Sequence, residues 1–239
     1  CIGSELWSDE PGFTEAMSGT GVTGICGSGI IEVVAEMYLA GILSTDGVVN
    51  GALAERTQRI QADGRTFSYA LHASSDPEIS DVLVTQNDVR QIQLAKAALY
   101  AGIKLLMDEM GVTAVDRIRL AGAFGSHISV SHAMVLGLIP DCDLEQVTSA
   151  GNAAGAGARM ALLDRNARLE IAATIAKAER IETAVADDFQ AHFVGAMGLP
   201  HQSDLFPNLF SVVAPPEAKV VESGDAPKRR RRRSSRTGA

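Results

Sequence analysis

The sequence has few aromatic residues, few cysteines and no long apolar stretch. Only 5% of its 239 residues are aromatic, three are cysteine, and one is tryptophan. No apolar run approaches the ~20 residues that a membrane-spanning helix requires, so we expect no membrane span. The composition, 46% hydrophobic and 21% charged, is typical of a globular protein and excludes collagen, coiled coil and wholly disordered chains. A chain of this length can bury a core without a disulfide or metal.

Cysteine and histidine are too scattered to indicate a metal site. The cysteines, Cys1, Cys26 and Cys142, include no Cys-x-x-Cys pair, and their odd number argues against a disulfide framework. The histidines never occur at the i, i+4 or His-x-His spacing that directs two imidazoles to one ion. We therefore predict a reducing, cytoplasmic setting, with no metal ligands and no iron–sulfur cluster in this chain.

Charge is divided unevenly along the chain. Residues 1–214 contain 13 lysines and arginines against 26 acidic residues, whereas residues 215–239 contain 8 against 3. An acidic body repels phosphate backbones, which argues against specific nucleic-acid binding. The basic tail has too few apolar residues to offset the entropy of ordering. We predict a globular domain over residues 1–200 and a linker with a disordered, arginine-rich tail over residues 201–239.

Apolar periodicity and turn residues predict alternating helices and strands, that is, an α/β fold. A helix opens at the glycine run 24–29 and closes before Gly41, because glycine readily adopts positive φ. The Asp-Gly dipeptide at 63–64 favours a hairpin turn between two β-like runs. A long helix begins after Thr85, whose hydroxyl suits a helix cap, and ends at Gly111.

The long helix carries two apolar stripes at 100° per residue, so we expect neighbours on two of its faces. One stripe is Val89, Ile92, Leu99, Ile103, Leu106 and Met110, and the other is Leu94, Ala98, Ala101 and Leu105. Lys96 falls within the first stripe, where an unpaired ammonium is costly. Two interpretations stay open: its side chain extends along apolar surface to water, or it contacts a nucleotide or a buried acid.

The second half of the chain continues the α/β pattern. Residues 117–121 are typical of a buried strand, and the glycine turn 122–125 directs the chain into a short helix over 131–136. The remaining expected elements are a helix ending near Asp164, a helix over 169–178, a strand over 180–183 and a helix over 187–197.

The first glycine turn is a candidate phosphate site. Gly27, Ser28 and Gly29 open a helix, where unpaired backbone amides and the helix dipole favour phosphate oxygens. The spacing matches neither GxGxxG nor the P-loop. The alternative is that the glycines only permit a tight entry into the helix.

The second glycine turn is a candidate nucleoside site. Gly122, Ala123, Phe124 and Gly125 follow the carboxyl end of a strand, where ligands gather in open α/β sheets. The glycines would let a ribose or a flat ring approach the backbone. Phe124 would then stack on that ring or, in the alternative, fill the core.

Nothing in the sequence indicates a catalytic residue. No Ser, His and Asp or Cys and His arrangement stands out, and adjacent acids such as Asp141 and Asp143 are expected to cap turns. Cys26, within the first glycine turn, is expected to be a small buried side chain.

Four segments taken together resemble one family, the reductive activators of corrinoid-dependent enzymes. They are GICGSG (24–29), VTQNDVRQIQLAK (84–96), LAGAFG (120–125) and GNAAGAGARMAL (151–162). The resemblance covers residues 20–200 in order. It implies the carboxyl-terminal lobe of an actin-like ATPase domain of the sugar kinase and heat-shock ATPase superfamily, with a mixed sheet flanked by helices. The chain begins with Cys1 and not with methionine, and we expect it to be part of a longer protein.

The resemblance also implies an activity for the whole protein. A ferredoxin-like [2Fe-2S] domain would precede the ATPase domain, and ATP with magnesium would drive electron transfer to cob(II)alamin. Cob(I)alamin would thereby be restored in a corrinoid protein or a cobalamin-dependent methyltransferase, and the activator would be a homodimer. The magnesium and phosphate motifs and the cluster cysteines are absent, as expected if they lie upstream, so this chain alone would not be catalytic.

At the level of residues the resemblance implies adenosine at Gly122 to Gly125, phosphates near Gly27 to Gly29 and the nucleoside near Lys96. Residues 151–157 would form a helix that links the two lobes. Two other functions stay open: a non-catalytic docking and dimerisation module for a corrinoid protein, and a lobe of a small-molecule kinase of the same superfamily.

Overall fold

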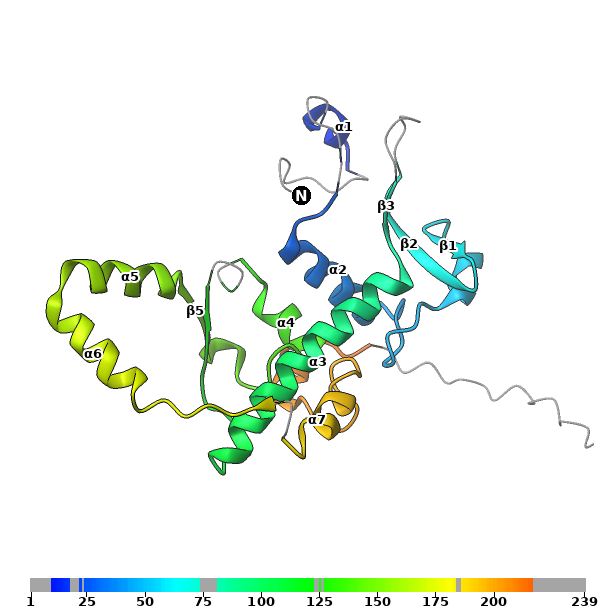
Figure 1. Ribbon diagram of the computed structural model, residues 1–239. Helices are drawn as coiled ribbons and strands as arrows, with labels where there is room; N and C mark the ends of the chain where they lie inside the picture. The colour runs from blue at the N-terminus through cyan, green and yellow to red at the C-terminus, as the bar shows by residue number, and fades with distance from the viewer. Residues whose placement is uncertain are drawn as a thin grey trace, which may run out of the picture.

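The computed structural model describes residues 10–17, 22, 24–73, 81–122, 125, 127–183 and 186–216 (Figure 1). Its elements are α1 (Phe13–Ala16), α2 (Gly27–Leu39), the 3-10 helix η1 (Gly51–Glu55), β1 (Ile60–Asp63), β2 (Thr66–His72), β3 (Val82–Val84), α3 (Gln86–Glu109), β4 (Ile118–Ala121), α4 (Val130–Leu136), the 3-10 helix η3 (Leu144–Gln146), β5 (Val147–Gly151), α5 (Ala153–Leu163), α6 (Arg165–Ile175), α7 (Phe189–Gly195) and α8 (Pro207–Val212). Helices are mixed with one antiparallel and one parallel sheet, which confirms the α/β class.

The long helix α3 begins and ends where the sequence predicts. The Thr85 hydroxyl oxygen accepts from the Asp88 amide at 3.1 Å, and the Asp88 carboxylate accepts from the Thr85 amide at 2.9 Å. This reciprocal capping satisfies two amide donors at the helix start. Gly111 follows the last turn at φ +66°, a backbone conformation that glycine adopts without strain.

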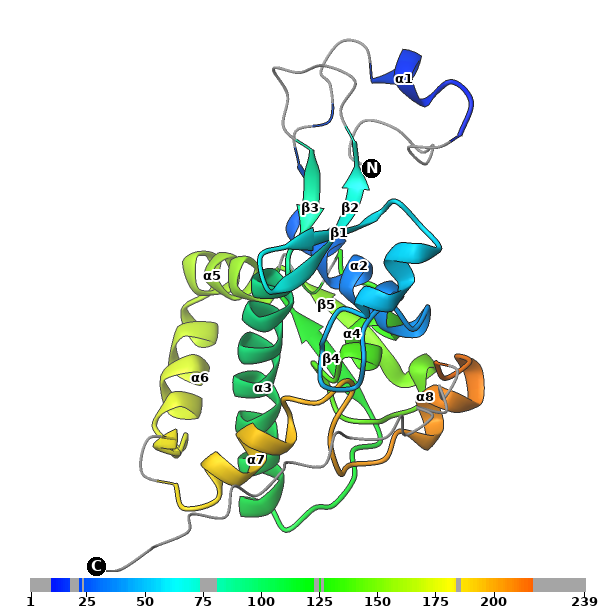
Figure 2. The same ribbon diagram turned by 90° about the vertical axis from the view of Figure 1, so that its right-hand side faces the viewer.

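The hairpin and the two sheets have simple topologies. β1 and β2 are antiparallel about the predicted Asp-Gly turn, with Asp63 opposite Thr66 and Gly64 at φ +61°. β3 adds to β2 in the order β1-β2-β3, whereas β4 and β5 form a separate parallel pair. Figure 2 shows the first sheet near the start of α3.

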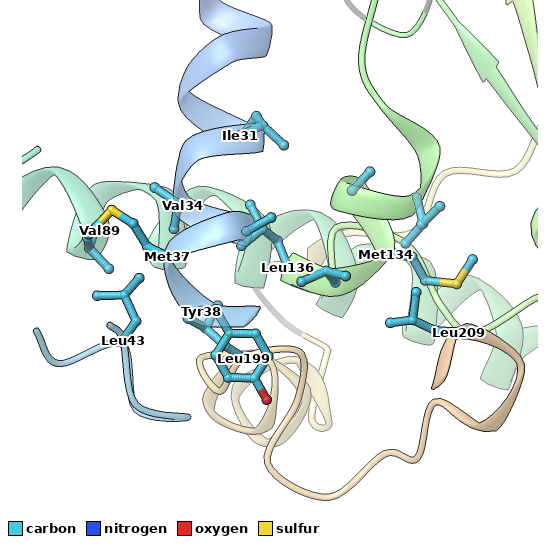
Figure 3. Close-up of a cluster of buried hydrophobic side chains, with 14 of the residues drawn as sticks. Ile31, Val34, Met37, Tyr38, Leu43, Val89, Met134, Leu136, Leu199 and Leu209 are labelled. Atoms are coloured by element: carbon cyan, nitrogen blue, oxygen red, sulfur yellow. The ribbon is translucent and has the colours of Figure 1, made fainter. Parts of the chain in front are cut away.

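The core lies between α2, α3, α4 and the segments around α7 and α8. Figure 3 shows side chains from α2 and α4 gathered with Leu199 and Leu209. The fully buried members include Val34, Met134 and Leu136. Burial of these apolar side chains is the main source of stability, at ~1.5–3 kcal/mol for each large one.

Residues 201–213, assigned above to a linker, pack against the core instead. Phe206 is buried and Leu209 is 0% exposed. Pro207 stands at the first position of α8, where its missing amide hydrogen costs nothing. The Asp141 carboxylate accepts from the Leu209 amide at 3.0 Å, so it caps a distant helix and not the turn in which it stands. The part of the chain that packs against the core therefore continues beyond the predicted boundary at residue 200.

The buried face of α3 differs from the predicted stripes. Its buried residues are Val89, Gln93, Lys96, Ala97, Tyr100, Ala101 and Met107. Leu99 and Leu106, predicted to be covered, are exposed. The buried face of α3 therefore differs from the predicted one by a rotation about the helix axis. It includes Gln93 and Lys96 because backbone carbonyl oxygens of other segments accept hydrogen bonds from these two polar side chains.

Two predicted features are wrong. β4 is not a buried strand, because Ile118 and Leu120 are half-buried while Arg119 and Ala121 are exposed. Residues 180–183 form no strand, and an exposed ion pair between Arg180 and Glu182 at 2.8 Å occupies this stretch. The helices predicted on either side are present as α6 and α7.

The helix pair α5–α6 contributes little to the core. Figure 1 shows it standing out from the remaining elements. Neither helix buries a large apolar side chain, and Ala167 is the one buried residue of the pair. Leu162, Leu163 and Ile175 are each more than 60% exposed. Across the described ranges no helix combines the length and the apolar character that crossing a membrane would take.

Candidate functional site

The carboxyl edge of the parallel sheet brings two glycines together. β4 and β5 pair from Ile118 and Val147 to Ala121 and Gly151, with a shift of register between Leu120 and Ala121. Gly122 and Gly151 have φ values of +106° and +63°, and the Gly122 amide donates to the Gly151 carbonyl oxygen at 2.8 Å. Both strands therefore turn at one edge, the position at which ligands bind in open α/β sheets.

The two described glycines of the second turn meet different demands. A Cβ added at Gly122 would find no atom of the described residues within 4 Å, so these residues leave the turn open on that side. A Cβ added at Gly125 would lie 3.0 Å from the Leu120 Cβ and 3.1 Å from its carbonyl carbon. Glycine is thus needed at position 122 for the positive φ of the turn, and at position 125 for the close approach to Leu120. Ala123 and Phe124 lie outside the described residues, so their predicted contacts with a nucleoside stay predictions.

The first glycine turn is capped by a thiol. Cys26 stands at the N-cap of α2, and its Sγ accepts from the Gly29 amide at 3.4 Å and lies 3.3 Å from the Ser28 hydroxyl oxygen. Gly27 is exposed, and Ser28 and Gly29 are half-buried, so the predicted cradle is at the surface. Cys26 is half-buried, not buried as expected.

The electrostatics of this turn favour negative charge. Hydrogen bonds from the Ser28 hydroxyl and then from the Gly29 amide lower the pKa of the Cys26 thiol. The positive end of the 13-residue helix α2 also favours the oxygens of a phosphate, while the Gly29 amide is already bonded to the Cys26 sulfur. The phosphate site predicted at Gly27, Ser28 and Gly29 stays a prediction.

One pair of packed helices connects the two turns. α2 begins at the first turn, α4 follows the second, and they pack together through buried side chains. His132 of α4 is hydrogen-bonded to Glu36 of α2 at 2.7 Å and to Ser129 at 2.7 Å. Figures 1 and 2 both show the start of α2 and the carboxyl ends of β4 and β5 toward the same end of the molecule.

Lys96 lies in the interior and not at this edge. It is 0% exposed, and its Nζ donates to the carbonyl oxygens of Gly198 and Pro200, the second at 2.7 Å. The side chain does not extend to water, which corrects one interpretation above. A nucleotide could not contact this side-chain nitrogen either, because protein atoms enclose it completely. We therefore remove Lys96 from the candidate site.

Gly151 and Asn152 belong to the edge but were not among the predicted site residues. The Asn152 side-chain oxygen accepts from the Gly155 amide at 2.9 Å and so caps α5 at the turn. Their signal is the β-branched start of the strand, Val147 and Thr148, followed after two residues by Gly151. Pairing of β5 with β4 could not be deduced from residue patterns alone.

Metal ligands and enclosed cavities do not mark this site. Within the described ranges no group of three or more His, Cys, Asp or Glu side chains could hold a metal ion. The described cysteines, Cys26 and Cys142, form no disulfide. Two shallow, open hollows of about 360 and 400 Å³ lie along the outer face of α3, and no glycine-turn residue lines them.

Comparison with known proteins gives concordant results. Residues 6–210 match the family described as the C-terminal domain of RACo, the ASKHA domain. The corrinoid activation enzyme RamQ of Eubacterium limosum is 36% identical over 154 residues, which are 61% of this chain and 26% of RamQ. A solved reductive activator for a corrinoid, iron–sulfur protein has a TM-score of 0.66 and 30% identity, covering 74% of this chain and 28% of that one.

The chain spans about a quarter of the length of these two relatives. The family match, in contrast, extends over most of the chain, from the short helix α1 into α8. The chain therefore belongs to the family of RACo C-terminal domains, the ASKHA or actin-like ATPase domains of reductive activators of corrinoid proteins.

Proposed function

We propose that this chain is the nucleotide-binding lobe of an ATP-dependent activator that returns cob(II)alamin to cob(I)alamin in a corrinoid protein. The observation that carries the proposal is the open glycine edge at Gly122 and Gly151, in a chain of the actin-like ATPase family. The names of the relatives, a corrinoid activation enzyme and a reductive activator, support the corrinoid partner.

The two glycine turns would share the nucleotide. The edge at Gly122 and Gly125 would seat adenosine, because an added Cβ at Gly122 meets no atom of the described residues, which would let a flat ring approach the backbone. The first turn, Gly27 to Gly29, would lie near the phosphates, where helix α2 directs its positive end. Ala123 and Phe124 complete the proposed adenosine turn.

The remaining parts of the activity would come from outside this chain. Magnesium ligands and the [2Fe-2S] cluster that supplies electrons are proposed for another part of a longer cytoplasmic polypeptide. The described residues offer no ligand set for either. The corrinoid protein or a cobalamin-dependent methyltransferase would accept the electron, and the activator would act as a homodimer.

The test is the variant Gly122→Val in the full-length protein. A β-branched residue at φ +106° strains the turn and places methyl groups in the space proposed for adenosine. We expect ATP affinity, measured by calorimetry, to fall about tenfold or more, which corresponds to ~1.4 kcal/mol or more of binding free energy.

Gly111→Val is the matched control. Gly111 has φ +66° and is equally open to an added Cβ, but it lies at the far end of α3 from the glycine edge. This variant also places a β-branched residue at positive φ, although with less strain than at φ +106°, and should bind ATP normally. Unchanged ATP affinity in a folded Gly122→Val protein would refute the adenosine role.

A further inference from the structure

One face of α3 holds a distant segment, residues 197–204, against the body of the molecule. Gln93 Nε2 donates to the Met197 carbonyl oxygen at 2.8 Å, and the Tyr100 hydroxyl donates to the Asp204 carboxylate at 2.8 Å. Lys96 lies one turn from each of these side chains, so three consecutive contacts are made along one helix face.

Lys96 provides the central contact of this face. Its Nζ donates to the carbonyl oxygens of Gly198 and Pro200, on either side of the fully buried Leu199. A Cβ added at Gly137 would lie 3.3 Å from the same Nζ, which shows how closely α4 closes over the amine. Among the ion pairs found between described residues, none includes Lys96.

The number of acceptors suits an uncharged amine. A neutral amine has two N–H donors, and two carbonyl oxygens accept from Lys96. An ammonium has three donors and carries a charge that loses its hydration on burial. The enclosed geometry therefore favours the amine over the ammonium for as long as the segment stays in place.

We propose that the uncharged Lys96 amine latches residues 197–204 to α3, and that uptake of a proton by this lysine favours release of the segment. Burial lowers the pKa of Lys96 from its usual 10.5 to about 7 while the latch is closed. A solvated lysine keeps a pKa near ~10.4, so the released form binds a proton more tightly. Release is coupled to protonation between these two values and becomes independent of pH below about 7.

The surrounding charged groups do not offer the ammonium a direct counter-ion. Burial lowers the pKa of His201, with Lys96 and Lys104 among the further causes, so the neighbouring cations disfavour one another. Asp204 is already bonded to Tyr100 and paired with Lys104 at 3.4 Å. The titratable groups around the latch are His201 and Asp204 in the segment, Tyr100 and Lys104 on α3, Asp141 in the loop after α4 and His192 on α7.

Hydrogen exchange of the full-length protein between pH 6 and 9, corrected for intrinsic rates, tests the latch. The reporters are the Leu199 amide, bonded to the Thr45 carbonyl oxygen at 2.8 Å, and the Gln202 amide, bonded to that of Gly195 at 2.9 Å. Their protection should fall about tenfold from pH 9 to pH 8, about fivefold from pH 8 to pH 7, and little below that. The Ala70 amide in β2 should not follow this profile.

Lys96→Met should abolish the pH dependence of the two reporters, whereas Lys104→Met, on the same helix, should retain it. If Lys96→Met does not fold, Lys96→Gln keeps two N–H donors without a titratable group and should also give a flat profile. A pH slope that persists in the folded Lys96 variant overturns the proposal. So does an Ala70 amide that loses protection in parallel, because the proton would then act on the whole fold.

Discussion

Single residues show which local features sequence reasoning can find. The cap at Thr85 was predictable because its partner, Asp88, lies three residues away and the chemistry is local. The environment of Lys96 was not, because the carbonyl oxygens that receive its hydrogen bonds are more than 100 residues further along the chain. The sequence indicated that the ammonium needed a partner, but it could not identify one.

Gly125 allows a stability test at this scale. In Gly125→Ala the new methyl group would lie 3.1 Å from the Leu120 carbonyl carbon, so backbone must move. We expect the free energy of unfolding, measured with urea, to fall by about 1–3 kcal/mol. Gly102→Ala is the control: it meets no atom within 4 Å inside helix α3 and should add about 0.5–1 kcal/mol. A neutral Gly125→Ala would contradict the close approach.

At the level of elements, the existence of helices was predictable and their orientation was not. Apolar periodicity and glycine stops located α2, α3, α4 and α7. The buried face of α3 escaped prediction because Gln93, Lys96 and Tyr100 are inside, where their polar groups are paired. The candidate site shows the same limit, since each glycine turn was predicted but the joining of Gly122 and Gly151 depends on strand pairing.

Adjacent positions on α3 test the observed face. Met107 is 6% exposed, whereas Leu106 is 54% exposed although the apolar stripe predicted it to be covered. Met107→Ala should cost about 2–5 kcal/mol in the free energy of unfolding, because it leaves a cavity in the core. Leu106→Ala should cost well under ~1 kcal/mol. Equal costs in urea unfolding would mean that the outer face of α3 is covered as well.

At the scale of the whole molecule, the division of the chain differs from the composition boundary. Composition changes after Pro200, yet Phe206 and Leu209 are in the core and Asp141 caps the helix that carries Leu209. A few buried side chains in a polar stretch are enough to fix a segment, and an average over composition conceals them.

Two truncated chains test whether residues 201–216 contribute to stability. A chain ending at Pro216 should keep its free energy of unfolding within ~0.5 kcal/mol, because it retains Phe206 and Leu209. A chain ending at Pro200 should lose about 3–6 kcal/mol from burial of those two side chains alone. Thermal and urea unfolding give the comparison. Equal stability of the two truncated proteins would contradict the packing of α8.

The helix pair α5–α6 has a practical consequence for handling the protein. The pair exposes apolar surface to water at Leu162, Leu163 and Ile175. Basic residues alternate with these positions along the two helices, namely Arg159, Arg165 and Arg168. Surface of this composition adheres to glass, to column resins and to other copies as concentration rises. The isolated chain should therefore be kept at low concentration. Self-association of the isolated chain would first be attributed to non-specific contacts of the helix pair α5–α6 and not to a biological oligomer.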